Sequence, residues 1–209
     1  MKFSFIEIYN ENIRDLLSED GRKQVTIGED NKGNITLTDA MEVTVRSAEQ
    51  IVGLISMGTA KRTSAATEYN LISSRSHAVL KMSMDVLHKG QRSTGKLFII
   101  DLAGSEKINN ESNRRRNEGS NINRSLLTLG NCINALVENM KKPGFAHVPY
   151  RDSKLTRLLK DSLGGTARTI MIACISPHPF TLDETITTLN YAERAQGIKR
   201  DIARNVKQM

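Results

Sequence analysis

Two short apolar runs limit the folds available to this chain more than any other feature of its sequence. Residues 97–100 read LFII and residues 170–175 read IMIACI, and polar or turn-forming residues border both runs. Such runs are too short to span a membrane and are typical of strands that are buried on both faces of a sheet. Helical patterns alternate with strand patterns along the rest of the chain. This alternation predicts an α/β fold with a central sheet.

The other elements follow from the spacing of apolar residues. Alternating patterns predict further strands at residues 3–9, 24–28, 35–45 and 78–86. Three- and four-residue spacing predicts helices at residues 47–62, 122–140, 153–163 and 181–198. Two of these helices begin with a capping box, at Ser47 and at Thr181. The polar residues 106–121 show no regular period, so no element is predicted there.

Composition narrows the class of protein and of partner. With 38% hydrophobic and 25% charged residues, the chain is typical of a globular domain. It has no signal-peptide pattern, and its two cysteines form neither a disulfide framework nor a zinc motif. These features favour a reducing, cytoplasmic setting. The net charge of +7 favours an acidic partner, which charge alone leaves open between nucleic acid, a membrane surface and an acidic protein.

The motif DLAGSE, residues 101–106, follows the first apolar run directly. An aspartate at the end of a buried strand can hold Mg²⁺ directly or through water, and a nearby glycine lets its backbone N–H approach a phosphate. Aspartate and glycine are also common turn formers, so the motif by itself is more often a plain turn.

A second polar motif, NLISSRSH, covers residues 70–77 ahead of the strand predicted at 78–86. Its hydroxyl groups could ligate Mg²⁺, and its arginine could pair with a carboxylate on a neighbouring loop. Taken alone, this stretch is more simply interpreted as a solvated, serine-rich connection. His77, at the strand entry, is expected to be a hydrogen-bonded structural residue.

Taken together and in this order, the two motifs resemble switch I and switch II of the kinesin motor domain. Four more stretches match the family in sequence order: FIEIYNE at 5–11, NINRSL at 121–126, HVPYRDSKLTRLL at 147–159 and LNYAERA at 189–195. The resemblance implies a kinesin-type P-loop NTPase motor fold, in which helices flank a central mixed sheet. It assigns residues 1–198 to a partial motor domain and 199–209 to the start of a neck linker. Residues 131–136 and 198–206 are most similar to the eighth kinesin class, which walks to microtubule plus ends and depolymerises them.

The resemblance also implies the residues of a nucleotide site for ATP or ADP with Mg²⁺. Ser74 and Asp101 would hold the metal, Asp101 through water. Asn70 and Ser73 would lie beside the phosphates, and the N–H of Gly104 would sense the γ-phosphate. Arg75 would pair with Glu106 to fix the attacking water. Such a site accelerates phosphoryl transfer by positioning and electrostatics.

The implied partner is the acidic surface of tubulin in the microtubule. Basic residues recur every third position from Arg151 to Lys160, a pattern that by itself is most often a solvated helix face. In the family the corresponding loop and helix lie on tubulin, as does the long helix after switch II. The residues expected to contact tubulin are Arg151, Lys154, Arg157, Asn123 and Arg115. A location on cytoplasmic microtubules, including the spindle, and a homodimer formed through segments beyond this chain are further expectations.

The chain departs from the family at the Walker A loop, Gly-x-x-x-x-Gly-Lys-Ser/Thr, which we expect ahead of residue 1. Residues 90–96, GQRSTGK, have the right glycine spacing, but Leu97 replaces the required Ser or Thr. A working P-loop also follows a strand and opens a helix, whereas residues 90–96 join two strand patterns and predict a hairpin. The alternatives are therefore a truncated motor ATPase and a nucleotide-independent microtubule-binding module. A nucleic-acid-binding domain would rest on charge alone, and neither nucleic acid nor membrane is an expected partner.

Overall fold

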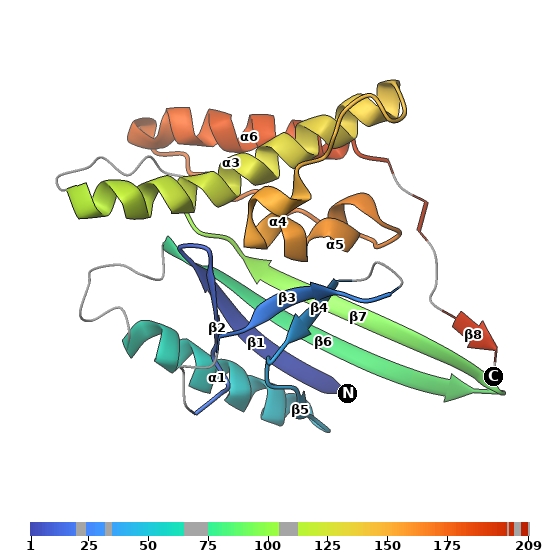
Figure 1. Ribbon diagram of the computed structural model, residues 1–209. Helices are drawn as coiled ribbons and strands as arrows, with labels where there is room; N and C mark the ends of the chain where they lie inside the picture. The colour runs from blue at the N-terminus through green and yellow to red at the C-terminus, as the bar shows by residue number, and fades with distance from the viewer. Residues whose placement is uncertain are drawn as a thin grey trace. The chain divides into compact units, whose positions relative to one another are not determined.

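The computed structural model describes residues 1–19, 24–31, 35–64, 75–104, 113–199, 201–202 and 206–208, and for residues 63–64, 113–123 and 206–208 it describes the backbone alone. The chain divides into two compact units, Met1–Gly104 with Arg204–Met209, and Ser105–Ala203. Among the described residues, the first unit holds the strands and helix α1, and the second is helical (Figure 1).

The sheet of the first unit has the order β2-β1-β6-β7-β8, with β5 also on β1. Its strands are β1 (Lys2–Tyr9), β2 (Asn12–Asp15), β5 (Val43–Thr44), β6 (His77–His88), β7 (Gln91–Asp101) and β8 (Val206–Gln208). Every pairing among these described strands is antiparallel. A separate antiparallel pair joins β3 (Thr26–Glu29) to β4 (Ile35–Thr38). The predicted strand 35–45 is therefore two short strands, β4 and β5, and Asp39 between them has a positive φ of 69° that an extended strand excludes.

Helix α1 (Ala48–Ser64) packs on this sheet and completes its core. The predicted capping box is present in part: the Ser47 hydroxyl accepts from the Gln50 N–H at 3.3 Å, while Gln50 accepts from the N–H of Arg46 rather than of Ser47. Gly58 lets the helix approach closely, because a Cβ there would overlap the ring of Phe5. The core is a cluster of buried apolar residues, Phe3, Phe5, Leu16, Leu17, Val45 and Ala78.

The hairpin β6–β7 is confirmed, but its turn is shorter than the predicted residues 90–96. Its two-residue turn, Lys89 and Gly90, has positive φ angles of 48° and 72°, as the tight turns that suit twisted hairpins require. Residues 91–96 lie in β7, so this segment forms no phosphate loop. The predicted burial of β7 on both faces is wrong, since Leu97 is 52% exposed and Ile99 is 50% exposed.

The second unit contains α3 (Asn113–Lys141), η1 (Tyr150–Asp152), α4 (Lys154–Leu158), α5 (Lys160–Gly164), η2 (Pro179–Thr181) and α6 (Leu182–Gln196). Helix α3 packs against α4, α6 and η1. It begins within the stretch for which no element was predicted, because a helical turn that is polar on every side shows no apolar period. The predicted helix 153–163 is two short helices that meet at Leu159. The Thr181 hydroxyl donates to the carbonyl of His178, so the predicted second capping box does not form.

The predicted strand at residues 169–175 is wrong. These residues have no regular structure, and Ile170 and Ile172 are 76% and 84% exposed. A strand requires a neighbour to satisfy its backbone N–H and C=O groups, and no described segment pairs with this one. An apolar run is therefore not sufficient to form a strand.

Candidate functional site

The two polar motifs leave the same end of the β6–β7 hairpin. The hairpin pairs Ala78 with Asp101, so the start of β6 lies beside the end of β7. Arg75 precedes Ala78 by three residues and Gly104 follows Asp101 by three. The described ends of the two motifs are thus adjacent at one edge of the sheet, although the motifs are separate in sequence.

Asp101 forms an ion pair with a residue that sequence reasoning missed. Its carboxylate is 74% exposed and lies 3.2 Å from Nη1 of Arg62, at the C-terminal end of α1. The Arg62 side chain is only 11% exposed. Its Nη2 donates to the carbonyl of Ser76 at 2.8 Å and its Nε to the Ser76 hydroxyl at 3.2 Å. Arg62 therefore connects the end of β7 to the residue just ahead of β6.

A buried carboxylate holds this arginine in place. Glu7 on β1 is 4% exposed; its Oε1 accepts from the Ser76 hydroxyl at 2.7 Å and lies 3.5 Å from Nε of Arg62. Its Oε2 lies 3.3 Å from Nη2 of Arg14. Burying a carboxylate costs free energy unless cations and hydrogen bonds compensate its charge, so Glu7 and these partners act as one network. The sequence does carry a signal for the burial of Glu7, because residues 3, 5 and 7 of one strand lie on the same face and Phe3 and Phe5 are core residues.

His77 adds a second link between the two motif ends. Its ring is buried, and Nδ1 accepts a hydrogen bond from the backbone N–H of Ala103 at 2.9 Å. Desolvation lowers the pKa of His77 to about 4, with Arg62 adding to the shift and Asp101 opposing it. The ring is therefore neutral at physiological pH, with its proton on Nε2. The structure confirms the hydrogen-bonded structural role expected for His77.

Only some of the residues that the sequence predicts to bind the nucleotide lie within the described part of the chain. Asn70, Ser73, Ser74 and Glu106 lie outside the described residues. Arg75 and Gly104 are half-buried.

Asp101 is the predicted Mg²⁺ ligand that lies within the described part of the chain. No group of three or more His, Cys, Asp or Glu side chains capable of holding a metal occurs in the described part of the chain. Mg²⁺ in nucleotide sites requires only one or two protein carboxylates, with phosphates and water as its other ligands. The exposed carboxylate of Asp101 is a group of this type, and in this structure it forms an ion pair with Arg62.

The residues predicted to contact tubulin fall on two segments of the second unit. Arg151 in η1 is exposed, and Lys154 and Arg157 in α4 are half-buried beside the buried Leu155 and Leu158. The Ser153 hydroxyl caps α4 by accepting from the N–H of Leu155 at 3.1 Å. Arg115 and Asn123 lie on α3, where the structure describes the backbone but not their side chains.

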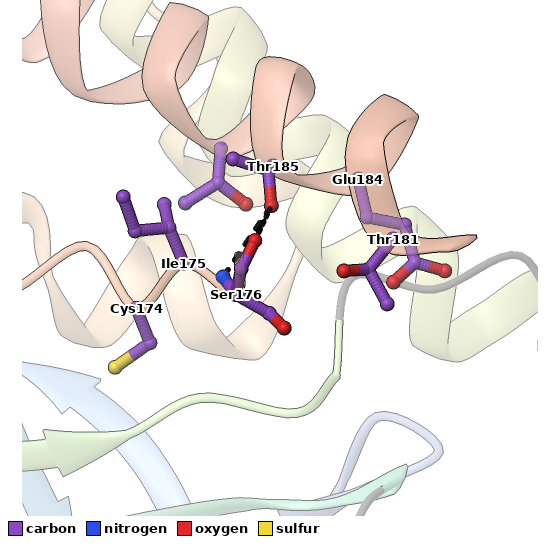
Figure 2. Close-up of a pocket in the computed structure, with 7 residues that line it drawn as sticks. Cys174, Ile175, Ser176, Thr181, Glu184 and Thr185 are labelled. Carbon is purple, nitrogen blue, oxygen red and sulfur yellow. Dashed lines mark hydrogen bonds between the residues drawn. The ribbon is translucent and has the colours of Figure 1, made fainter. Parts of the chain in front are cut away.

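The second unit also contains a small pocket. Figure 2 shows it between residues 174–176 and the start of α6, where the Thr185 hydroxyl donates to the Ser176 carbonyl at 3.1 Å. Its volume is about 260 Å³. The lining residues are Cys174, Ile175, Ser176, Thr181, Glu184, Thr185 and Thr188. None of the sequence-predicted site residues is among them.

Comparison with known proteins gives consistent matches along the chain. The family model for the kinesin motor domain matches residues 1–198. Kinesin-like protein KIP3 of Saccharomyces cerevisiae is 48% identical over 98% of this chain, and kinesin-like protein KIN-8B of Arabidopsis thaliana is 45% identical over 97%. Members of the eighth class are thus among the relatives, and the chromosome-associated kinesin KIF4 of Gallus gallus also reaches 48% over 99%.

A solved structure of a fast kinesin superposes with a TM-score of 0.84 at 36% identity, covering 99% of this chain. The chain spans 58% of that structure and 26%, 25% and 17% of KIP3, KIN-8B and KIF4, respectively. The fold is therefore that of the kinesin motor, and this chain belongs to the kinesin motor domain family.

Proposed function

We propose that this chain is the switch-bearing and microtubule-binding part of a motor that couples ATP hydrolysis to movement along microtubules. The observation that carries the proposal is the pairing of Ala78 with Asp101, which brings the two switch segments to one edge of the sheet. Phosphoryl transfer needs groups on both switches within reach of one phosphate. An arrangement with the segments at opposite edges would exclude this chemistry.

In this proposal Ser74 and Asp101 hold Mg²⁺, with Asn70 and Ser73 beside the phosphates of ATP or ADP. Gly104 senses the γ-phosphate through its N–H, and Arg75 pairs with Glu106 to orient the attacking water. The Walker A loop, absent from these 209 residues, is supplied by polypeptide outside them. Residues 199–209 act as the start of a neck linker, which the pairing of β8 with β7 supports, because it is the contact expected of a docking segment.

The microtubule is the proposed partner, through Arg151, Lys154, Arg157, Arg115 and Asn123. The matched fast kinesin interacts with microtubules, and the net charge of +7 on this chain suits an acidic polymer. The proposed location is therefore on cytoplasmic microtubules. Among the described helices, none combines the length and the apolar character that crossing a bilayer demands.

Steady-state ATP turnover of the full-length protein, with and without microtubules, tests this function. We expect microtubules to stimulate turnover, and Ser74→Ala and Glu106→Ala each to abolish the stimulated rate. Ser56→Ala, on the exposed face of α1, is the matched control and should leave turnover unchanged. The isolated 209-residue chain should show no turnover because it lacks the Walker lysine and loop amides.

The second candidate is a nucleotide-independent microtubule-binding module, favoured by the lack of a Walker A motif in this sequence. It predicts that the full-length protein pellets equally with microtubules in ADP and in a non-hydrolysable ATP analogue. A nucleotide-dependent difference in pelleting would exclude it. No ATP turnover under any condition, together with unchanged pelleting, would replace the motor proposal with this one.

A further inference from the structure

The loop after α3 carries an exposed phenylalanine, Phe145, in a hydrogen-bonded turn. Phe145 is 69% exposed, and the loop that bears it projects from the C-terminal end of α3 (Figure 1). Isolated exposed apolar residues are common on protein surfaces, so exposure alone assigns no role. The local structure around Phe145 provides the further observations.

Hydrogen bonds define the backbone of the turn that bears the ring. Pro143 and Gly144 occupy its two central positions, and Gly144 has a φ of +74°, which a glycine adopts without strain. The N–H of Phe145 donates to the carbonyl of Lys142 at 3.1 Å and closes the turn. The Asn139 side chain bonds both backbone groups of Ala146, the residue after Phe145. It donates to the Ala146 carbonyl and accepts from the Ala146 N–H, each at 2.8 Å.

The ring lies near one lysine, and the sequence on both sides of Phe145 is mainly basic. Nζ of Lys142 lies 5.5 Å from the ring centroid, within the range of a cation–π contact. Between Glu138 and Lys154 the sequence has four Lys or Arg residues, Lys141, Lys142, Arg151 and Lys154, against two acidic ones, Glu138 and Asp152. This charge favours an acidic partner, and the ring favours a partner that offers an apolar contact within its acidic surface.

We propose that Phe145 is an aromatic anchor for the acidic outer surface of tubulin, which the basic residues of η1 and α4 are also proposed to contact. This inference rests on the proposed function and adds a contact that salt does not screen. Aromatic residues dominate the energy of interfaces, and a turn whose backbone is already closed costs little to order on binding. The basic residues steer the encounter, and Phe145 slows dissociation.

Microtubule co-pelleting of the full-length protein at two salt concentrations tests the anchor. We expect Phe145→Ala to weaken affinity about tenfold at both concentrations, as loss of a buried interface aromatic does. The salt dependence of binding should stay as in the parent. Phe145→Trp should bind like the parent. Phe180→Ala, which removes a 93% exposed phenylalanine elsewhere in the same unit, is the matched control and should bind unchanged.

The outcomes separate this inference from the proposed function. If the parent does not pellet, the microtubule-binding function fails and the anchor with it. If the parent pellets and Phe145→Ala pellets within twofold of it, only the anchor is overturned. The alternative is that Phe145 contacts a second copy of the chain, which sedimentation velocity without microtubules tests. If the parent forms an oligomer that Phe145→Ala disperses, while pelleting is unchanged, the ring belongs to that contact and the proposal is overturned.

Discussion

Arg62 at the end of α1 lies 3.2 Å from the carboxylate of Asp101 at the end of β7, and the same guanidinium donates to the carbonyl of Ser76 ahead of β6. One buried cation therefore contacts both ends of the hairpin from which the switch segments leave. Kinesin switches must close together around a phosphate in the proposed mechanism. Arg62 fixes the positions from which both segments start.

Arg62→Ala should destabilise the first unit. It leaves the buried Glu7 carboxylate without one of its cations, and removing one partner of a buried ion pair costs about 3 kcal/mol. Thermal unfolding of the full-length protein measures the loss. The double variant Arg62→Met with Glu7→Gln should recover most of it, because no uncompensated charge remains. Equal melting temperatures for the single and double variants would show that the charge pair is not the cause.

His77 should make stability depend on pH. Its pKa is about 4 in the folded protein against 6.5 for the ordinary group, so the unfolded chain binds the proton more tightly. The free energy of unfolding should therefore fall as pH drops from about 6.5 toward 4, by about 2 kcal/mol between pH 7 and 5.

His77→Asn provides the control for this prediction, because its side-chain oxygen can still accept from the N–H of Ala103 but cannot titrate. Melting curves of parent and variant at pH 7 and 5 should converge at the lower pH. Parallel losses in both proteins would assign the pH dependence to other groups.

Gly130 should not tolerate alanine. A Cβ at this position of α3 would lie 2.6 Å from the hydroxyl of Tyr191 on α6, which donates to the carbonyl of Leu126 at 2.5 Å. Overpacking of this kind costs about 1–3 kcal/mol. Gly53→Ala on α1 is the matched control, since nothing lies within 4 Å of its Cβ, and it should stabilise its helix by about 0.5–1 kcal/mol.

Adding Tyr191→Phe to Gly130→Ala removes the overlapping oxygen. The double variant should therefore melt above the Gly130→Ala single variant in the full-length protein. If it melts lower, the close approach of the tyrosine is not what excludes a side chain at position 130.

The isolated 209-residue chain should unfold without a sharp cooperative transition. Leu97 and Ile99 leave an apolar face of β7 exposed, and Ile170 and Ile172 are exposed in a segment without regular structure. Exposed apolar strands favour aggregation. Calorimetry and dye binding to apolar surface measure the outcome. A sharp, reversible melt with no dye binding would show that the chain is self-sufficient.

The sequence alone determined the elements whose causes are local. The β6–β7 hairpin, α1 and α6 follow from side-chain periodicity and turn residues that lie within a few positions of one another. The sequence motifs also placed Asp101 at the end of a strand and Arg75 in the segment just ahead of one, because both positions follow from the order of residues along the chain. No local pattern predicted the first turns of α3 or the absence of a strand at residues 169–175, since strand formation depends on a neighbour.

Only the tertiary structure decided which charges meet. Ser76 and Glu7 are 69 positions apart and Arg62 and Asp101 are 39 apart, yet all four meet where β1, the entry to β6, the end of β7 and the end of α1 converge. Periodicity places a residue on a face of its own element but does not say which face of another element lies opposite. The buried Glu7 carboxylate needs cationic and hydrogen-bonding partners to offset its desolvation. Distant elements supply those partners, so they can be identified only once the packing of the sheet and the helix is known.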